Sequence, residues 1–278
     1  MVPVNRRHGE SVTLASSPMS HRLDRYEKKF VVTHDKRRRL LDAMAPHLRV
    51  DANTGVDSFY PIVSLYYDNR ERDFYWERYR NLGSRRKLRV RIYGSRTGGI
   101  PPTSFIEVKH KYEGRGVKRR LLIPLEAALA LGEGRLPAAP LGFADLKVAR
   151  EVTTLVASRQ LEPVCVMRYD RQAFAGTDEE TDLRVTFDAG IRYRLDRLLP
   201  EADDADFAHR VIDEDTSVME IKFTGALPYW LSLLLGRFGC LPVSFSKYST
   251  ALEQGDPVLR GAPYRRVALR PETLLPTT

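Results

Sequence analysis

The segment Lys87-Leu-Arg-Val-Arg-Ile-Tyr93 indicates most clearly how this chain folds. Successive side chains of a β-strand point to opposite faces of the sheet. Read as a strand, the segment has basic side chains on one face, at Lys87, Arg89 and Arg91, and aliphatic side chains on the other. It therefore predicts a strand with one ionic face and one apolar face.

The same alternation recurs in other strand-like segments. The ionic positions are Arg25, Glu27 and Lys29; Glu107, Lys109 and Lys111; Lys118 and Arg120; Arg184, Thr186 and Asp188; and Glu220 and Lys222. A single such strand needs only a solvent-exposed side, but basic side chains directly across neighbouring strands repel each other. Repeated basic rows are sustained when a polyanion lies on them, because arginine donates paired hydrogen bonds to phosphate and lysine supplies charge. Acids on such a face would hold a divalent metal ion that bridges phosphate oxygens.

Eight strand-like segments, bounded by Gly, Pro, Asn or Asp, run through the chain. They are residues 25–32, 62–67, 87–93, 104–112, 117–123, 163–174, 183–191 and 217–223. Apolar residues at helical spacing occur in residues 34–44, 69–80, 143–158 and 227–238. Many short strands with few long helices predict an antiparallel α+β domain, of which a closed barrel is one form.

The two ends of the chain differ from its middle. Residues 1–20 are polar and small without a sustained period, which predicts a flexible N-terminal arm. Residues 256–278 contain four prolines and predict a loosely ordered C-terminal tail. We therefore expect one domain over residues 21–255.

The positive charge is concentrated in one segment. The chain has 45 Lys and Arg against 36 Asp and Glu, a net charge of +9, and residues 85–120 contain twelve of the basic residues but only two acids. Such a concentration favours an anionic partner. A nucleic acid is disfavoured, because these basic residues alternate with aliphatic side chains instead of lying among stacking aromatics.

Composition narrows the class further. Hydrophobic residues make up 42% of the chain and charged residues 29%, which excludes global disorder. No apolar run reaches the roughly 18 residues that a membrane span needs. The N-terminus lacks the apolar stretch of a signal peptide, and the two cysteines, Cys165 and Cys240, lie in apolar segments. These features predict a cytoplasmic protein without disulfides.

Arg25-Tyr-Glu-Lys-Lys29 resembles the first strand of the triphosphate tunnel metalloenzymes, the CYTH-like superfamily, which is usually written E-x-E-x-K. Arg25 replaces the first acid, as in the VTC (vacuolar transporter chaperone) polyphosphate polymerase branch. Further motifs follow in the order of that branch: Leu65–Asn69, Lys87–Tyr93, Phe105–Lys111, Val166–Arg171, Leu183–Asp188, Val218–Phe223 and Phe245–Ser249. Together these segments make residues 22–253 similar to a VTC domain.

The resemblance implies an eight-stranded antiparallel β-barrel that forms a tunnel, with basic side chains inside and helices packed outside. It implies transfer of the γ-phosphate of ATP to a growing polyphosphate chain, with Mn²⁺ or Mg²⁺ as the cofactor. The matching positions imply that phosphates are gripped by Lys29, Arg89, Arg91, Lys109, Arg168 and Lys247. Further implied phosphate-binding residues are Arg25, Lys111, Lys118, Arg120, Arg184, Lys222 and Ser246. Glu220 is the implied metal ligand, and Glu27 and Glu107 are secondary candidates that would act through water.

Several alternatives stay open at this point. The missing acid at Arg25 favours transfer or binding over two-metal hydrolysis, but a triphosphatase on the same fold remains an alternative. So does a non-catalytic module that binds polyphosphate or an inositol pyrophosphate, although such a sensor could dispense with Glu220. Arg171 and Arg168 are three residues apart, so in a regular strand their side chains point to opposite faces. Both face inward only if a bulge intervenes. Translocation of a polymer product would require a separate membrane-protein partner.

Overall fold

The computed structural model describes residues 25–51, 59–80, 83–94, 103–113, 115–138, 140–177, 182–200 and 206–259. The predicted N-terminal arm lies outside the described residues, as do residues 260–278 of the predicted tail. The first residues of that tail are described, and among them Asp256 and Leu259 are buried against the rest of the fold.

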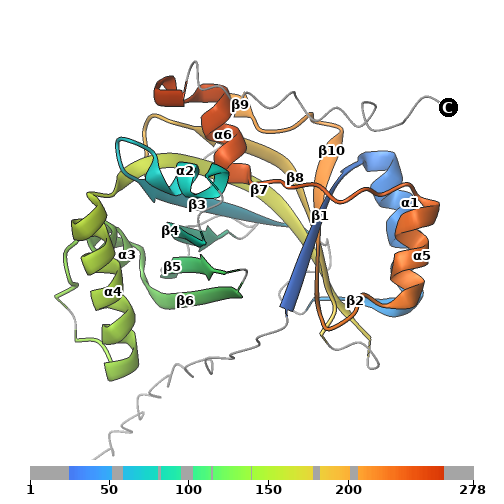
Figure 1. Ribbon diagram of the computed structural model, residues 1–278, viewed down its shortest axis with the longest axis horizontal. Helices are drawn as coiled ribbons and strands as arrows, with labels where there is room; N and C mark the ends of the chain where they lie inside the picture. Colours follow the sequence, from blue (N-terminus) through green and yellow to red (C-terminus); the bar gives the residue numbers. More distant parts are fainter. Residues whose placement is uncertain are drawn as a thin grey trace, which may run out of the picture.

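Ten strands and six α-helices make up the described part of the chain (Figure 1). The strands are β1 (Arg25–Thr33), β2 (Leu48–Val50), β3 (Tyr60–Asp68), β4 (Ser84–Tyr93), β5 (Thr103–Tyr112), β6 (Arg115–Pro124), β7 (Glu162–Gly176), β8 (Arg184–Arg194), β9 (His209–Arg210) and β10 (Thr216–Thr224). The helices are α1 (His34–Met44), α2 (Asp73–Tyr79), α3 (Leu125–Gly132), α4 (Phe143–Arg159), α5 (Tyr229–Arg237) and α6 (Lys247–Gly255). Short 3-10 helices cover Ala45–His47 and Pro257–Leu259.

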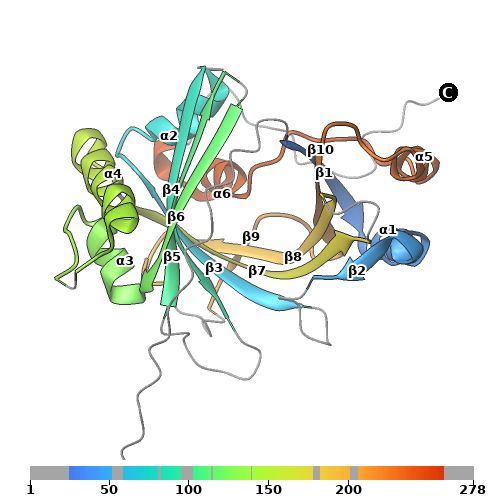
Figure 2. The same cartoon turned by 90° about the horizontal axis from the view of Figure 1, so that it is seen from below.

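The predicted α+β class is confirmed. Eight long strands form one antiparallel sheet in the order β1-β10-β8-β7-β3-β4-β5-β6, with β2 paired to β7 and β9 to β8. The sheet curls strongly, so that β4–β6 and the pair β1–β10 form its two ends (Figure 2). Within the described residues β1 and β6 share no ladder, so the eight strands form a half-barrel, which agrees with the predicted eight-stranded antiparallel barrel fold.

All eight predicted strands are confirmed, and their ends differ from the prediction by at most three residues. Most of the sheet is covered by helices on its outer face only, so apolar and polar side chains alternate along its strands. This alternation is why the strands were predicted well. The helices α3 and α6 and the short strands β2 and β9 were not predicted. The N-terminus of α1 follows the usual capping rule, since the Thr33 hydroxyl accepts a hydrogen bond from the Lys36 amide.

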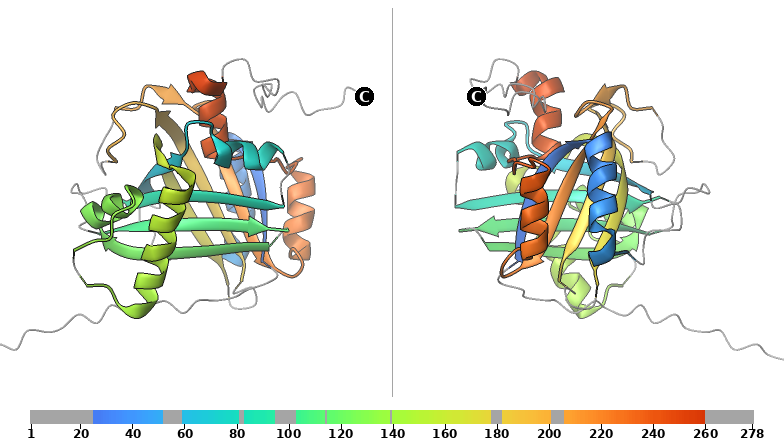
Figure 3. Two further views of the ribbon diagram at one scale, coloured as in Figure 1. Left: turned by 60° about the vertical axis from the view of Figure 1, so that its left-hand side comes forward. Right: turned by 90° about the vertical axis from the view of Figure 1, so that its right-hand side faces the viewer.

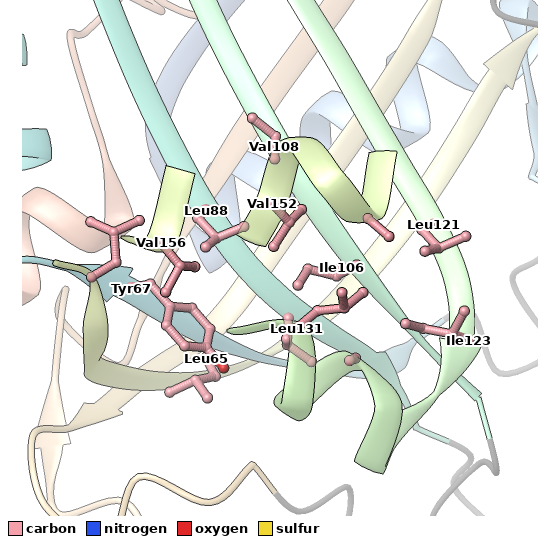
Figure 4. Close-up of a cluster of buried hydrophobic side chains, with 14 of the residues drawn as sticks. Leu65, Tyr67, Leu88, Ile106, Val108, Leu121, Ile123, Leu131, Val152 and Val156 are labelled. Carbon is pink, nitrogen blue, oxygen red and sulfur yellow. The ribbon is translucent and has the colours of Figure 1, made fainter. Parts of the chain in front are cut away.

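Two apolar cores lie on the outer, convex side of the sheet. The first packs α3 and α4 on strands β3–β6, and Figure 4 shows Val152, Val156 and Leu131 of these helices reaching Leu88 and Ile106 of the strands. The second packs α1 and α5 on β1, β8 and β10. Figure 3 shows each helix pair lying across its own end of the sheet. The outward positions beneath these helices are therefore mainly apolar.

A third core lies on the inner, concave side. There α6 packs on β3 and β7, and Tyr248 of α6 stacks on Tyr66 of β3 with ring centroids 5.1 Å apart. Because this core occupies only part of the concave side, the remaining inward positions of the strands are left to polar and charged side chains.

Candidate functional site

Cross-strand register places the charged positions of seven strands on the concave side of the sheet, which we call the inner face. These positions are Glu27 and Lys29 of β1; Glu220 and Lys222 of β10; Arg184, Thr186 and Asp188 of β8; Arg171 of β7; Lys87, Arg89 and Arg91 of β4; Glu107, Lys109 and Lys111 of β5; and Lys118 and Arg120 of β6. The pairing of the strands therefore brings their ionic faces together on the concave side of the sheet.

Glu220 is the centre of one ionic cluster on the inner face. Its carboxylate lies 3.3 Å from the ammonium groups of Lys247 and Lys222 and 3.6 Å from that of Lys29. Glu27 lies 3.3 Å from Lys29 and 3.8 Å from Lys222, so the two carboxylates share two lysines. The cluster joins β1, β10 and the first residue of α6.

Asp188 extends this cluster toward β7. Its carboxylate accepts two hydrogen bonds from the Arg171 guanidinium, at 2.6 and 2.7 Å, and lies 2.5 Å from Lys247. Lys247 therefore bridges Asp188 and Glu220. A buried bidentate pair of this kind holds the arginine in one orientation.

Glu107 is the centre of a second cluster, on strands β4–β6. It pairs with Arg89 at 2.6 Å, lies 4.0 Å from Arg91, and also pairs with Lys118. Burial alone would raise the pKa of Glu107, but Arg89, Arg91 and Lys118 outweigh it and hold that pKa well below its usual range. This carboxylate is thus ionised and engaged by cations on three sides.

Two tyrosines connect the clusters. Arg89 donates to the Tyr66 hydroxyl at 3.2 Å, and Arg91 donates to the Tyr169 hydroxyl at 3.0 Å. The Tyr169 ring also lies 4.9 Å from the ammonium of Lys247, a cation–π distance. Tyr169 therefore stands between the Glu107 cluster and the Glu220 cluster, and both belong to one continuous site.

Electrostatics across the concave side show that its two ends face each other. Burial is the largest influence on the Glu27 pKa and would raise it, but Lys29 and, from β5, Lys109 help to lower it to about 2. Burial is the largest influence on the pKa of Lys222 and lowers it; Glu220 raises it, and Lys109 lowers it from across the site. A charge on β5 thus shifts the pKa values of residues on β1 and β10, although these strands are not neighbours of β5 in the sheet.

The Glu220 carboxylate is ionised in this environment. Its burial would raise the pKa, but the positive charges of Lys29, Lys247 and Lys222 hold it well below its usual range. An ionised carboxylate is available to a metal ion that arrives together with phosphate.

Lys87 and Ser246 form a contact that the sequence did not reveal. The Lys87 ammonium donates to the Ser246 hydroxyl at 2.8 Å, and that hydroxyl caps α6 by accepting from the Ser249 amide. Burial, followed by the cations Arg78, Lys29 and Lys109, holds the pKa of Lys87 well below its usual range. Ser246 is thereby placed on the inner face beside a lysine of β4.

The N-terminus of α6 is positioned by α2 and the end of β3. The Tyr248 hydroxyl donates to Asp68 at 2.6 Å, while Asp68 also accepts from the amides of Phe74 and Tyr75 at the start of α2. Arg72 pairs with Asp256 at 2.6 Å, beyond the C-terminal end of α6. These contacts fix the helix that carries Lys247.

We expect Tyr248→Phe to destabilise the protein by about 1.5–3 kcal/mol, because it removes a buried hydrogen bond to a charged group. The free energy of unfolding, measured by urea denaturation, tests this. Tyr229→Phe is the matched control, since Tyr229 is 78% exposed on α5 and its loss of a hydroxyl should change stability by less than about 0.5 kcal/mol. Equal stability of the two variants would contradict the positioning role of Tyr248.

The structure brings most of the predicted site residues together. Lys29, Arg89, Arg91, Lys109 and Lys247 all lie on the inner face or at its edge, with Lys111, Lys118, Lys222 and Ser246 beside them. Arg184 is at the inner edge of β8 and pairs with Asp51 at 2.9 Å, and Arg120 lies 4.9 Å from the ring of Phe105. Arg25 belongs to β1, but its side chain lies outside the described part of the structure.

Arg168 is not brought to the cluster. It is opposite Val63, an outer-core residue of β3, whereas its neighbour Tyr169 reaches Arg91 on the inner face. Arg171, which the sequence left open, takes the inward place. The ladder of β7 with β8 shifts between Arg168 and Asp170, next to Gly190 at φ +57°, and this bulge sets Asp188 opposite Arg171.

The three predicted metal ligands do not form one group. Among the described residues no three His, Cys, Asp or Glu side chains gather as a metal site would require. Glu220 and Glu27 fit an ion that arrives with phosphates, because Mg²⁺ is usually held by one or two carboxylates together with phosphate oxygens. Glu107 belongs to the other cluster and is engaged by Arg89 and Lys118.

In the part of the chain that the structure describes, the helices are too short or too polar for any of them to span a bilayer. Cys165 and Cys240 are both free, in agreement with the predicted absence of a disulfide.

The fold resembles the crystal structure of a proposed adenylate cyclase from Bacillus halodurans, with 13% sequence identity over 79% of this chain and 92% of that chain and a TM-score of 0.47. No curated protein matches the chain. The model of the VTC domain matches residues 24–254, which include every described residue of the inner face. The chain therefore belongs to the VTC domain family.

Proposed function

We propose that this protein is a metal-dependent phosphotransferase that moves the γ-phosphate of ATP onto a growing polyphosphate chain. The observation that carries the proposal is the charge of the inner face, where the described positions include Lys29, Arg89, Arg91, Lys109, Lys222 and Lys247 but few carboxylates. A concave surface with such an excess of cations concentrates a polyanion. Membership of the VTC domain family supports the same substrate class.

The transfer step needs positioning and charge neutralisation more than covalent chemistry. Phosphoryl transfer passes through a loose transition state with the attacking and leaving oxygens in line. In the proposed mechanism Arg89 and Arg91 hold the triphosphate of the nucleotide, while Lys29 and Lys247 stabilise the charge that develops on the transferred group. The terminal phosphate of the acceptor chain is the nucleophile, so no side chain is required to attack.

A divalent ion, Mn²⁺ or Mg²⁺, would be held by Glu220, with Glu27 as a second carboxylate. When bound, such an ion would neutralise phosphate charge and act as a Lewis acid. The lysines that pair with Glu220 would then turn to the phosphates, which replace the carboxylate as their partner.

Two other activities fit the same fold. A triphosphatase would use the same cations but release phosphate to water. A binding module would hold polyphosphate or an inositol pyrophosphate without turnover. Glu220 favours an enzyme over a binding module, since a purely cationic site binds anions without a buried carboxylate that it must first neutralise.

Incubation of the purified protein with ATP and Mn²⁺ separates these three activities. Polyphosphate visible on a stained gel supports the proposal. Phosphate release without polymer would identify a triphosphatase, and tight tripolyphosphate binding without turnover would identify a binding module. When variants of the inner face are assayed in the same way, Lys28→Gln is a suitable control. Lys28 is exposed and pairs with Ile221 on the other face of the sheet.

We expect the affinity for tripolyphosphate to fall as the pH rises from about 7 to about 9. Burial lowers the pKa of Lys118 to about 8, against the attraction of Glu107, so this lysine loses its positive charge as the pH passes that value. Loss of one cation weakens anion binding by about two- to fivefold. Lys118→Arg keeps its charge and should show a flatter profile in titration calorimetry. Identical pH profiles of the two proteins would refute this role of Lys118.

We also propose a cytoplasmic location, supported by the two free cysteines, and a separate membrane-protein partner if the product is to cross a membrane.

A further inference from the structure

The Ser246 hydroxyl makes three hydrogen bonds at the start of α6. The Nζ atom of Lys87 lies 2.8 Å from its oxygen, while the amide and the hydroxyl of Ser249 lie 3.3 and 3.1 Å from the same atom. The serine is buried and directly precedes Lys247, the first residue of the helix. These contacts hold the hydroxyl in one place on the inner face, with a lysine as its nearest polar partner.

Lys87 and Ser246 have the arrangement of a general base and its nucleophile. In such a pair the two groups lie within hydrogen-bond reach, and a third group orients the base. Here the ring of Tyr248 lies 5.5 Å from Nζ of Lys87 and orients it. Burial is the largest influence on the pKa of Lys87 and holds it well below its usual range, and nearby cations lower it further. Lys87 therefore reaches its neutral amine form more readily than an exposed lysine does.

The two forms of Lys87 give the Ser246 hydroxyl different roles. An ammonium donates to the oxygen and occupies one lone pair, and the Ser249 amide occupies the other. A neutral amine accepts the hydroxyl proton instead, which frees one lone pair to attack phosphorus. The Ser249 hydroxyl does not have to donate here, because its hydrogen rotates to suit its surroundings.

A phosphate on Ser246 would lie among positive charges. The Lys29 ammonium donates to the carbonyl oxygen of Phe245, the residue before Ser246, at 3.2 Å, and Lys87 reaches Ser246 from β4. The N-terminus of a helix also stabilises a phosphate, through its free amides and its dipole. The phosphorylated residue would thus keep its place as the cap of α6.

We propose that Ser246 accepts the γ-phosphate of ATP when no chain occupies the site, with Lys87 as the general base. The Ser246 oxygen forms a bond to the γ-phosphorus, and the bond from that phosphorus to the β–γ bridging oxygen breaks. ADP leaves with the electron pair of the broken bond, and the hydroxyl proton moves to Nζ of Lys87. The phosphoserine is then the first acceptor of the chain. This inference rests on the proposed function and names the primer that transfer requires.

Labelling without added primer tests the inference. The full chain, incubated with γ-labelled ATP and Mn²⁺ but no polyphosphate, should gain phosphate that mass spectrometry of its peptides locates at Ser246. A serine ester survives acid, whereas phosphate on the nitrogen of lysine or histidine does not, so the label should be acid-stable. Longer incubation should add further phosphates to the same peptide.

Two substitutions of Lys87 separate base catalysis from charge. We expect the rate of labelling to fall about 10²-fold or more in both Lys87→Gln and Lys87→Arg, because a general base contributes about 10²–10⁴-fold and arginine stays protonated. Ser249→Ala is the matched control, since it removes a neighbouring hydroxyl but keeps the contact of Lys87 with Ser246. Its label should still be found at Ser246. Labelling at the wild-type rate in Lys87→Arg would overturn the role of Lys87 as base.

Ser246→Ala should make polymer synthesis depend on an added primer. Ser246 also lies beside the phosphate site, so the readout is the ratio of synthesis without primer to synthesis with tripolyphosphate. We expect this ratio to fall about tenfold or more, because the variant has lost the first acceptor. Ser232→Ala, on the exposed side of α5, should keep the wild-type ratio. If Ser246→Ala does not fold, Ser246→Asn takes its place, since asparagine also caps a helix.

A wild-type protein that makes polymer but carries no phosphate on Ser246 overturns this inference and leaves the proposed function standing. So does a folded Ser246→Ala variant whose ratio equals that of the wild type. Failure of the wild type to lengthen tripolyphosphate with ATP would instead count against the proposed function itself.

Discussion

Glu220→Gln is expected to lower metal-dependent turnover by about 10²–10³-fold while the protein stays folded. The substitution removes the carboxylate that three lysines of the cluster share. Lys247 keeps Asp188 as a partner, and Lys29 and Lys222 keep Glu27, so each of the three lysines retains an acidic partner. The metal would lose its ligand, and the cations that remain would hold the phosphates without it.

A measurement of anion binding distinguishes loss of the metal ligand from general damage to the site. Without metal, the variant should bind tripolyphosphate as tightly as the wild type or more tightly, because the site has lost a negative charge. Glu151→Gln breaks the Arg119 ion pair on the outer side of the sheet and should change neither turnover nor binding. Near-normal polyphosphate synthesis by Glu220→Gln would refute the metal assignment.

Arg89→Ala and Arg91→Ala are each expected to weaken nucleotide binding by about 10- to 100-fold, since a hydrogen bond to a charged group contributes about 1.5–3 kcal/mol. Removing Arg89 also leaves Glu107 with less positive charge around it, so that its carboxylate repels the phosphates. Affinity for a non-hydrolysable ATP analogue, measured by calorimetry, is the direct readout.

Arg89→Lys tests whether geometry or charge matters more. Lysine restores the charge but not the paired donors, so its affinity should lie between those of the wild type and the alanine variant. Arg119→Ala removes an arginine on the opposite face of β6 and serves as the control. Unchanged affinity in both alanine variants would contradict the inward orientation of these arginines.

The strands were predictable because their side chains obey a period of two. In Lys87–Tyr93 the basic positions turned inward and the aliphatic positions joined the outer core, as the pattern predicts. The helix α1 was predicted with the right bounds because Leu40, Leu41 and Met44 lie at helical spacing, and Leu40 and Met44 are its buried residues.

The face of the sheet to which a side chain points was less predictable than the positions of the strands. Arg168 and Arg171 cannot both face inward: pairing with β3 sets Arg168 opposite the outer-core residue Val63, and a bulge at Gly190 in β8 then sets Asp188 opposite Arg171. Nothing within the β7 sequence encodes that shift. The Arg171–Asp188 pair was missed for this reason, and with it the link between β7 and Lys247.

The role of α6 was also hidden. Its sequence, Lys247–Gly255, has no long amphipathic pattern, and it reaches the inner face only through tertiary contacts. Tyr248 is held by Asp68, 180 residues away, and Ser246 by Lys87, 159 residues away. Because these contacts join distant segments, Ser246 and Lys247 were predicted only through the family resemblance, and the contact between Lys87 and Ser246 was not predicted.

A crystal structure of the protein with a non-hydrolysable ATP analogue and Mn²⁺ tests the central claim, that the inner face is the phosphate site. We expect the triphosphate between Arg89, Arg91 and Lys29, and the anomalous signal of Mn²⁺ beside Glu220. A triphosphate bound on the convex side, or a manganese signal away from both Glu220 and Glu27, would contradict the account.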